Sequence, residues 1–190
     1  PQPVIRTDWL EATGLPAPET VEDFTAMLTA VSQGDLDGDG TANTYGVTTA
    51  DTTAELDAVF NRAFGITATW MQGADGGWVN SVVSDQERAK LGYYRSLVEA
   101  GLMDPEYIST NWEVKEDKFY TGRVGVIFGS SAEVIDIYGG KMRQVFPDAT
   151  LTLLPPPAGE GGQGLMAVDV SKESRGLAVS ALSEHKDVAF

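Results

Sequence analysis

Three aspartates alternate with small residues between Gly34 and Gly46, in the stretch G-D-L-D-G-D-G-T-A-N-T-Y-G. Solvated carboxylates at this spacing repel one another, but they can converge on one hard cation where glycines let the backbone curl around it. The pattern D-x-D-x-D-G matches the first half of a calcium loop of the EF-hand type, with Gly40 at the sharp turn. The predicted ligands are the side chains of Asp35, Asp37, Asp39 and Asn43 and the backbone carbonyl of Thr41.

The second half of this stretch departs from an EF-hand. The twelfth position, where an EF-hand has a bidentate glutamate, is Gly46, and residues 44–49 have the composition of a strand rather than of a second helix. The sequence therefore predicts a calcium loop without an EF-hand around it. The alternative is a surface turn rich in Asp and Gly that is stabilised by its own Asx hydrogen bonds.

Length and composition limit the class of protein. The chain has 190 residues, of which 42% are hydrophobic, so it can form one domain with a real core or two small lobes. Its net charge of −15 disfavours nucleic acid and anionic membranes as partners. It has no cysteine, which excludes disulfides, thiolate metal sites and a cysteine nucleophile.

Apolar periodicity and capping residues predict an α/β chain that is rich in helices. Helices are expected to begin at Asp8, Thr20, Thr53, Ser84, Asn111 and Gly129. Strands are expected at 45–49, 123–128, 151–154, 165–170 and 176–182.

Two of these helices carry more detailed predictions. The helix that begins at Thr20 has one apolar stripe, formed by Val21, Phe24, Met27, Leu28 and Val31. The helix that begins at Ser84 has a capping box with Glu87, and its predicted inward residues are Leu91, Tyr94, Leu97 and Val98.

A hairpin is predicted at residues 66–83. Segments 67–72 and 78–83 are rich in strand-forming residues, and they flank a Gly-rich turn that contains Asp75-Gly76.

Catalysis has little support in the sequence. The one histidine, His185, lies among charged residues in a helix that begins at Ser183, and no G-x-S-x-G, Walker or H-E-x-x-H motif is present. The aromatic residues indicate binding instead. Trp70, Trp78 and Trp112 lie in or beside irregular segments, where a Trp ring can cover the apolar face of a sugar; the alternative for each is packing between elements.

A turn between a predicted strand and a predicted helix offers polar groups for ligand binding. Gly129-Ser130-Ser131 offers backbone amides and hydroxyls at a helix N-terminus, where they can hydrogen-bond a polar ligand.

Several segments, in consistent order, resemble the extracellular solute-binding lipoproteins of carbohydrate-uptake ABC transporters. They are Ile5 to Leu10, Thr20 to Phe24, Asp35 to Tyr45, Ala63-Phe64-Gly65 with Trp70, Asp75 to Val79, Tyr93 through Gly101 to Glu106, and Phe119 to Gly125. Together they cover nearly the whole chain.

The resemblance implies a two-lobed receptor that closes on its ligand. Residues 1–190 would form its second lobe, a periplasmic-binding-protein-like unit with several helices packed on a small mixed sheet. The chain begins at Pro1 and stops within the helix that begins at Ser183, so we expect a fragment whose first lobe and lipid-modified cysteine lie upstream. Similar proteins hold a structural calcium ion in the Asp-rich loop, with an acidic residue where this chain has Thr44.

We therefore expect an extracellular receptor, not an enzyme, that binds an oligosaccharide and delivers it to a membrane permease. By position in the family, the ligand-binding residues are expected to be Trp70, Asn111, Trp112, Gly129, Ser130 and Ser131. Two alternatives remain open. One is a secreted, calcium-stabilised adhesion or interaction module, and the other is a glycoside-active enzyme that uses two carboxylates.

Overall fold

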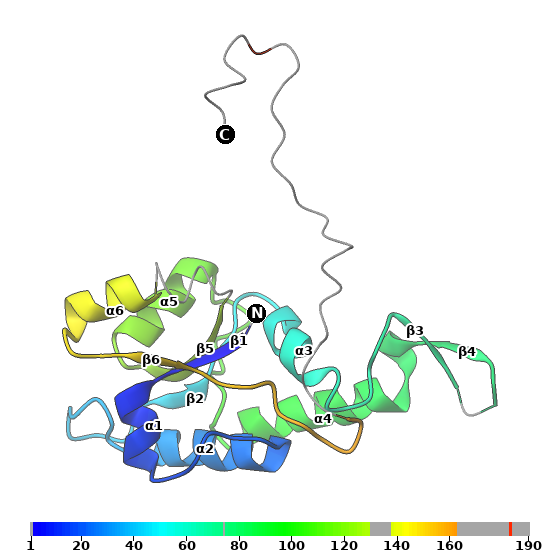
Figure 1. Cartoon of the computed structure of the whole chain (residues 1–190), viewed down its shortest axis with the longest axis horizontal. Coiled ribbons are helices and arrows are strands. Elements are labelled where there is room, and N and C mark those ends of the chain that lie inside the picture. Colours follow the sequence, from blue (N-terminus) through cyan, green and yellow to red (C-terminus); the bar gives the residue numbers. More distant parts are fainter. Residues whose placement is uncertain (1, 74, 130–137, 163–182, 184–190) are drawn as a thin grey trace.

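The computed structural model describes residues 2–73, 75–129, 138–162 and 183 (Figure 1). Within these residues the chain forms a mixed four-stranded sheet, helices on both faces of that sheet, and a separate two-stranded hairpin. The sequence prediction of helices on a small mixed sheet is confirmed. The strands predicted at 165–170 and 176–182, and residues 130–137 of the helix predicted to begin at Gly129, lie outside the described residues; Gly129 itself ends a strand.

The four-stranded sheet joins segments from both ends of the described chain. Its strands are β1 (Gln2–Arg6), β2 (Tyr45–Val47), β5 (Val124–Gly129) and β6 (Leu151–Leu153), in the spatial order β2-β5-β1-β6. Strand β1 is antiparallel to both β5 and β6, so that Val4 lies opposite Ile127 and Leu153. Strand β2 is parallel to β5. No strand was predicted at 2–6, although β1 is an interior strand of the sheet.

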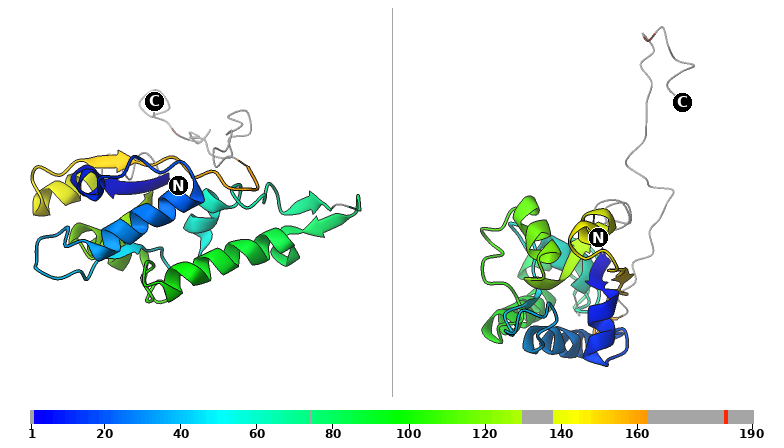
Figure 2. Two further views of the ribbon diagram at one scale, coloured as in Figure 1. Left: turned by 90° about the horizontal axis from the view of Figure 1, so that it is seen from below. Right: turned by 90° about the vertical axis from the view of Figure 1, so that its left-hand side faces the viewer.

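Helices cover the two faces of the sheet in different pairs. Figures 1 and 2 show α1 (Thr7–Thr13) and α2 (Val21–Gln33) on one face, and α5 (Trp112–Tyr120) and α6 (Gly139–Val145) on the other. Helix α3 (Ala54–Phe60) lies beside the end of the sheet, and α4 (Asp85–Glu99) continues the level of α2 beyond it. Among the described residues, no helix combines the length and apolar composition that crossing a membrane requires.

The larger hydrophobic core lies between α2 and the sheet. The predicted stripe of α2 is buried at Phe24, Met27, Leu28 and Val31, and packs with Ile5, Val126 and Phe128 of the sheet. A Cβ atom on Gly125 would overlap the Val31 side chain, so glycine allows β5 to approach α2 closely. Burial of this apolar stripe supplies the main stabilisation of the layer.

Thr20 caps the N-terminus of α2, as predicted, and Asp23 completes a capping box with it. Thr20 Oγ1 accepts a hydrogen bond from Asp23 N–H at 3.1 Å, and the Asp23 carboxylate accepts one from Thr20 N–H at 3.1 Å. These bonds hold the pKa of Asp23 below its usual range.

A second core lies under α5 and α6. Its buried residues are Val4, Val124 and Ile127 of the sheet with Phe119, Tyr120, Tyr138 and Met142. Because both faces of the sheet are covered, β5 is buried at every residue, as the apolar composition of 123–128 predicts.

The hairpin is shorter than predicted. Strands β3 (Trp70–Gln72) and β4 (Trp78–Asn80) pair antiparallel, while Ser81–Val83 forms a 3₁₀ helix, η1, instead of continuing the strand. Asn80 Oδ1 accepts a hydrogen bond from Val82 N–H at 3.1 Å and so caps this turn. The cap ends β4 and leads the chain into α4.

Predictions for α4 are confirmed only in part. Tyr94 and Leu97 are buried, but Leu91 and Val98 are exposed, and Lys90 lies in the core instead. The Lys90 ammonium is 2.7 Å from Asp57 Oδ1 and 3.1 Å from Glu87 Oε2. Lys90 shares a helix face with Tyr94 and Leu97, so the buried face of α4 includes a charged residue that the hydrophobic residues alone do not indicate.

The caps of α4 and α1 differ from those predicted. Ser84 Oγ accepts a hydrogen bond from Glu87 N–H, but the Glu87 carboxylate pairs with Lys90, so only half of the capping box has its predicted role. Helix α1 begins after Arg6 without a side-chain cap, because the carboxylate of Asp8 instead accepts a hydrogen bond from Arg6 Nε at 3.0 Å.

Candidate functional site

Asn111 and Trp112 begin helix α5. Asn111 Oδ1 accepts a hydrogen bond from Val114 N–H at 2.9 Å, so the predicted cap is confirmed. Trp112 is the first residue of the helix and 38% of its surface is exposed. The two predicted ligand-binding residues are thus adjacent, and each is fixed by the geometry of the helix N-terminus.

A buried lysine lies one turn further along α5, against the Trp112 ring. Lys115 is fully buried, and its ammonium nitrogen lies 3.5 Å from the centroid of the Trp112 ring. A cation above an aromatic face is attracted by the ring quadrupole, most strongly where water is excluded. The contact holds one part of the indole in place while another part remains exposed.

The same ammonium group binds two oxygens. Lys115 Nζ lies 2.7 Å from Glu55 Oε1 and 3.2 Å from the carbonyl of Phe128. Glu55 in turn accepts a hydrogen bond from Thr49 Oγ1 at 3.0 Å through its other oxygen. A buried charge is costly unless it is paired and hydrogen-bonded, and these partners meet that requirement.

This network joins α3, α5 and the end of β5. The sequence alone gave neither Lys115 nor Glu55 a role. The spacing of Trp112 and Lys115, three residues apart on a helix, is the one local signal that brings them together.

Gly129 ends β5 next to Phe128, and its small size has a packing reason. A Cβ atom at this position would overlap the ring of Tyr138, whose hydroxyl donates a hydrogen bond to the Phe128 carbonyl at 3.1 Å. Ser130 and Ser131, the other predicted residues of this turn, lie outside the described residues.

Trp70 lies apart from this group. It is on β3 of the hairpin, which projects from the body of the molecule, whereas α5 lies against the sheet (Figures 1 and 2). Its side chain is 57% exposed. Among the described residues, no contact joins Trp70 to Trp112.

The three loop aspartates converge as predicted. Asp35, Asp37 and Asp39 each offer a carboxylate oxygen, and these oxygens lie within 4.8 Å of one another. Gly38 and Gly40 have φ of 75° and 88°, which are left-handed values that favour glycine. The loop therefore has the backbone geometry that brings its carboxylates onto one centre.

The loop also contains the Asx hydrogen bonds of the alternative interpretation. Asp39 Oδ1 accepts a bond from Thr41 N–H at 2.8 Å, and Asp35 Oδ2 accepts one from Gly40 N–H at 3.0 Å. The Asn43 amide donates to Asp39 Oδ2 at 2.9 Å, and the Thr41 carbonyl accepts Asn43 N–H at 3.0 Å. Each oxygen keeps further lone-pair capacity, so these bonds are compatible with a cation.

Thr44 anchors the loop to the sheet. It is buried, and its hydroxyl donates a hydrogen bond to the carbonyl of Gly122 at 2.9 Å. A Cβ atom on Gly122 would lie 3.0 Å from the Cβ of Asp37, so glycine permits the loop to rest against the turn after α5. Thr44 thus serves to anchor the loop in this chain.

A groove of about 730 Å³ runs between the Asp loop and α5. Lys118 lies along it, 2.7 Å from Asp104 Oδ2 and 2.8 Å from Glu106 Oε2. Burial opposes the charge on Lys118, but the hydrogen bonds to both carboxylates outweigh burial and raise its pKa above the usual value. Lys118 therefore stays charged and leaves the loop aspartates to other partners.

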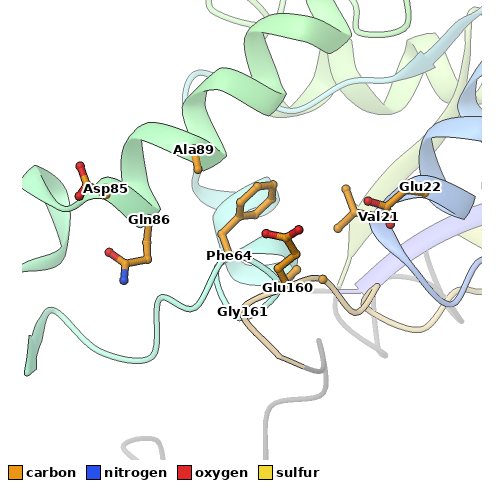
Figure 3. Close-up of a pocket in the computed structure, with 10 residues that line it drawn as sticks. Val21, Glu22, Phe64, Asp85, Gln86, Ala89, Glu160 and Gly161 are labelled. Atoms are coloured by element: carbon orange, nitrogen blue, oxygen red, sulfur yellow. The ribbon is translucent and has the colours of Figure 1, made fainter. Parts of the chain in front are cut away.

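A second hollow, of about 410 Å³, lies between the start of α2, the end of α3, the start of α4 and the loop at 159–161. Figure 3 shows Phe64 near its centre, with the carboxyl groups of Glu22, Asp85 and Glu160 around it. None of the described ligand-binding candidates lines this hollow.

Comparison with known proteins gives the family. The chain matches the family described as bacterial extracellular solute-binding protein over residues 4–190, and it belongs to this family. Its fold is that of the periplasmic-binding-protein-like solute-binding proteins, as the sequence predicts.

Two relatives show how far the likeness extends. The fructooligosaccharide ABC transporter substrate-binding protein FusA of Streptococcus pneumoniae is 30% identical over 128 residues, which are 65% of this chain and 24% of FusA. The polygalacturonan/rhamnogalacturonan-binding protein YtcQ of Bacillus subtilis is 23% identical over 137 residues, or 70% of this chain and 27% of YtcQ. The chain thus spans about a quarter of the length of either relative.

A solved structure agrees with these matches. The S. pneumoniae FusA EF-hand mutant in complex with fructo-nystose superposes with a TM-score of 0.67 at 26% identity, covering 85% of this chain and 32% of that chain. The family and both of these relatives are described as binding proteins.

Proposed function

We propose that this chain is the helix-rich second lobe of the substrate-binding component of an ABC importer, and that the full-length protein binds an oligosaccharide between two lobes. Family membership and the sugar-binding relatives support the proposal. The observation on this chain that carries it is the partly exposed Trp112 ring, held against the buried Lys115 at the start of α5.

In this function the Trp112 ring covers the apolar face of a sugar unit. A buried cation on one part of the indole fixes the ring before the ligand arrives, so little side-chain entropy is lost on binding. Trp70 provides a second ring, while Asn111, Gly129, Ser130 and Ser131 bind hydroxyl groups through side-chain or backbone polar groups. Closure of the two lobes then encloses the sugar for transfer to a membrane permease.

The Asp loop would hold Ca²⁺ as a structural clamp. Its proposed ligands are the carboxylates of Asp35, Asp37 and Asp39, the Thr41 carbonyl and the Asn43 amide oxygen. Convergence of three carboxylates within 4.8 Å supports this assignment, as does the anchoring of the loop through Thr44. The ion would neutralise mutual repulsion of the aspartates and so stabilise the junction between the loop and α5.

The proposed location follows from the family. Extracellular solute-binding proteins work outside the cytoplasmic membrane, and a lipoprotein of B. subtilis, LipO, is 27% identical over 140 residues of this chain. We therefore place the full-length protein at the outer surface of the membrane, anchored by an upstream lipid-modified cysteine. Nucleic acid is not proposed as a partner, because the net charge is −15.

Lobe closure gives a test of this function. Small-angle scattering on the full-length protein, without its lipid, should show a smaller radius of gyration when a saturating oligosaccharide is added. Trp112→Ala should abolish the contraction at the same sugar concentration, whereas Ile108→Ala, which removes another exposed hydrophobic side chain, should keep it. The proposal would be overturned if no oligosaccharide reduced the radius of gyration of either the wild type or the Ile108→Ala control.

A further inference from the structure

One face of the β3–β4 hairpin gathers two tryptophans and two amides. Trp70 pairs with Asn80 and Gln72 pairs with Trp78 in the antiparallel register, and side chains of directly paired residues point to the same face. Because residues two apart on a strand also share a face, all four side chains lie on one side of the hairpin. We call this set the aromatic hairpin face: Trp70, Gln72, Trp78 and Asn80.

The two indoles of this face are open to solvent. Trp78 is 70% exposed and Trp70 is 57% exposed. They stand diagonally across the two strands, a spacing of about 7–8 Å between backbone positions. Figures 1 and 2 show the hairpin projecting beyond the body of the molecule, so that neighbouring described elements leave this face uncovered.

The opposite face of the hairpin is turned toward the start of α4. Met71 and Val79, a cross-strand pair, are partly buried and line a hollow with Ser84 and Asp85 at the start of α4, and Gln72 reaches the rim of the same hollow. A hydrogen bond of 2.7 Å from Gly73 N–H to the Gly77 carbonyl closes the turn. The hairpin thus turns the Met71–Val79 pair toward α4, and its two indoles lie on the opposite face.

The chemistry of the aromatic hairpin face fits a neutral sugar. An indole covers the apolar face of a sugar ring, and amides at its edge exchange hydrogen bonds with hydroxyls. Gln72 Nε2 donates to the Gly76 carbonyl and Asn80 Oδ1 accepts from Val82 N–H, but each amide keeps further hydrogen-bonding capacity that a sugar hydroxyl can use. An anionic glycan would find no cation on this face and would meet the carboxylate of Asp75 at the turn.

We propose that the aromatic hairpin face is a second binding surface, which holds sugar units of a long neutral oligosaccharide beyond those bound at Trp112. The proposal rests on the proposed receptor function. It assigns a binding role to Trp78, Gln72 and Asn80 and gives the protein a preference for longer chains. Each ring adds apolar burial only when the ligand is long enough to reach it.

The test is titration of the full-length protein with a length series of fructo-oligosaccharides and one of malto-oligosaccharides, beginning at the trisaccharides. Trp78→Ala should weaken binding of the longest member of a bound series by roughly tenfold or more, because a whole ring contact is lost. The same variant should bind the shortest bound member as wild type does. Trp78→Phe, which keeps an aromatic ring, should lose much less.

Ile108→Ala is the matched control, since Ile108 is exposed to a similar extent, 68%, on another part of the surface. Equal binding of the longest sugar by wild type and Trp78→Ala would overturn the inference while leaving the receptor function intact. Wild type that binds neither series at any length would overturn both.

A second measurement asks whether Trp78 is open in the sugar-free protein. The difference in acrylamide quenching between wild type and Trp78→Phe reports on Trp78. Trp78 fluorescence should be accessible to acrylamide in the sugar-free protein and protected when the longest sugar is bound. Protection in the absence of sugar would mean that another part of the full-length protein covers this face, which would also overturn the inference.

Discussion

Lys115 and Trp112 form a single unit, because the buried ammonium nitrogen of Lys115 lies 3.5 Å from the centroid of the partly exposed Trp112 ring. Replacement of this lysine should affect both stability and binding. Lys115→Met leaves Glu55 without its 2.7 Å partner, and we expect the free energy of unfolding to fall by about 3–5 kcal/mol. Urea unfolding followed by circular dichroism measures this loss.

Two variants make that result specific. Glu55→Gln combined with Lys115→Met removes both charges and should recover part of the lost stability. Arg95→Met removes a side chain that is 78% exposed and pairs with Glu99, itself 61% exposed, so it should change stability very little. Equal losses for Lys115→Met and Arg95→Met would contradict the buried network.

Asn111 has two separable roles, as helix cap and as proposed ligand contact. Asn111→Ala should lower the free energy of unfolding by about 1 kcal/mol, because the 2.9 Å bond to Val114 N–H is lost. Asn111→Asp keeps a capping oxygen but removes the amide donor, so we expect unchanged stability with weaker sugar binding. If Asn111→Asp binds sugar as wild type does, the amide is not a ligand contact.

Calcium should stabilise the Asp loop. Excess chelator should lower the melting temperature of the wild-type protein, and added Ca²⁺ should restore it, because an ion that binds only the folded state stabilises that state. Asp37→Asn retains an oxygen that can accept the 3.3 Å bond from Asp39 N–H but removes one charge. This variant should respond less to calcium, whereas Asp148→Asn, at another exposed site, should respond as wild type does.

The melting experiment also distinguishes a calcium site from a turn that is held only by its own Asx hydrogen bonds. A turn stabilised only by its Asx bonds predicts that chelator changes neither wild type nor Asp37→Asn. That result would leave the loop geometry correct and the metal assignment wrong.

The Lys118–Asp104 pair predicts an alkaline limit to stability. Asp104 has a side chain that is 1% exposed, and Lys118 is its cation at 2.7 Å. The folded-state pKa of Lys118 is raised above its usual value of 10.5, so this contribution is complete below that pH. Stability should then fall as pH rises through the higher folded-state pKa.

Lys118→Met should lower stability at neutral pH by about 3 kcal/mol, because Asp104 remains buried without its cation. The variant should also lack the decrease in stability at alkaline pH that comes from deprotonation of Lys118. Thermal melts between neutral and strongly alkaline pH would measure this difference. Parallel pH profiles for wild type and Lys118→Met would contradict the assignment.

Features that depend on local sequence were predictable. The apolar stripe of α2, the caps at Thr20 and Asn111, and the convergence of Asp35, Asp37 and Asp39 all follow from spacing within a few residues. These features need no knowledge of distant parts of the chain.

Features that depend on distant partners were not predictable in this way. Strand β1 is short and pairs with β5 and β6, which come much later in the chain, so its own residues give little signal. Lys90 and Lys115 are buried with carboxylates of α3 as partners, and a lysine is normally expected at the surface, so the residue type alone did not indicate burial. For the same reason, the sequence showed Trp112 as a candidate but not the cation that holds it.

The most direct measurement of the central claim is calorimetric titration of the full-length protein, without its lipid, against a panel of oligosaccharides in calcium-containing buffer. We predict saturable binding of at least one oligosaccharide, strongly weakened binding by Trp112→Ala, and recovery of the sugar intact by chromatography afterwards. Failure to bind any sugar, or recovery of cleaved sugar, would contradict the account of this protein as a carbohydrate receptor.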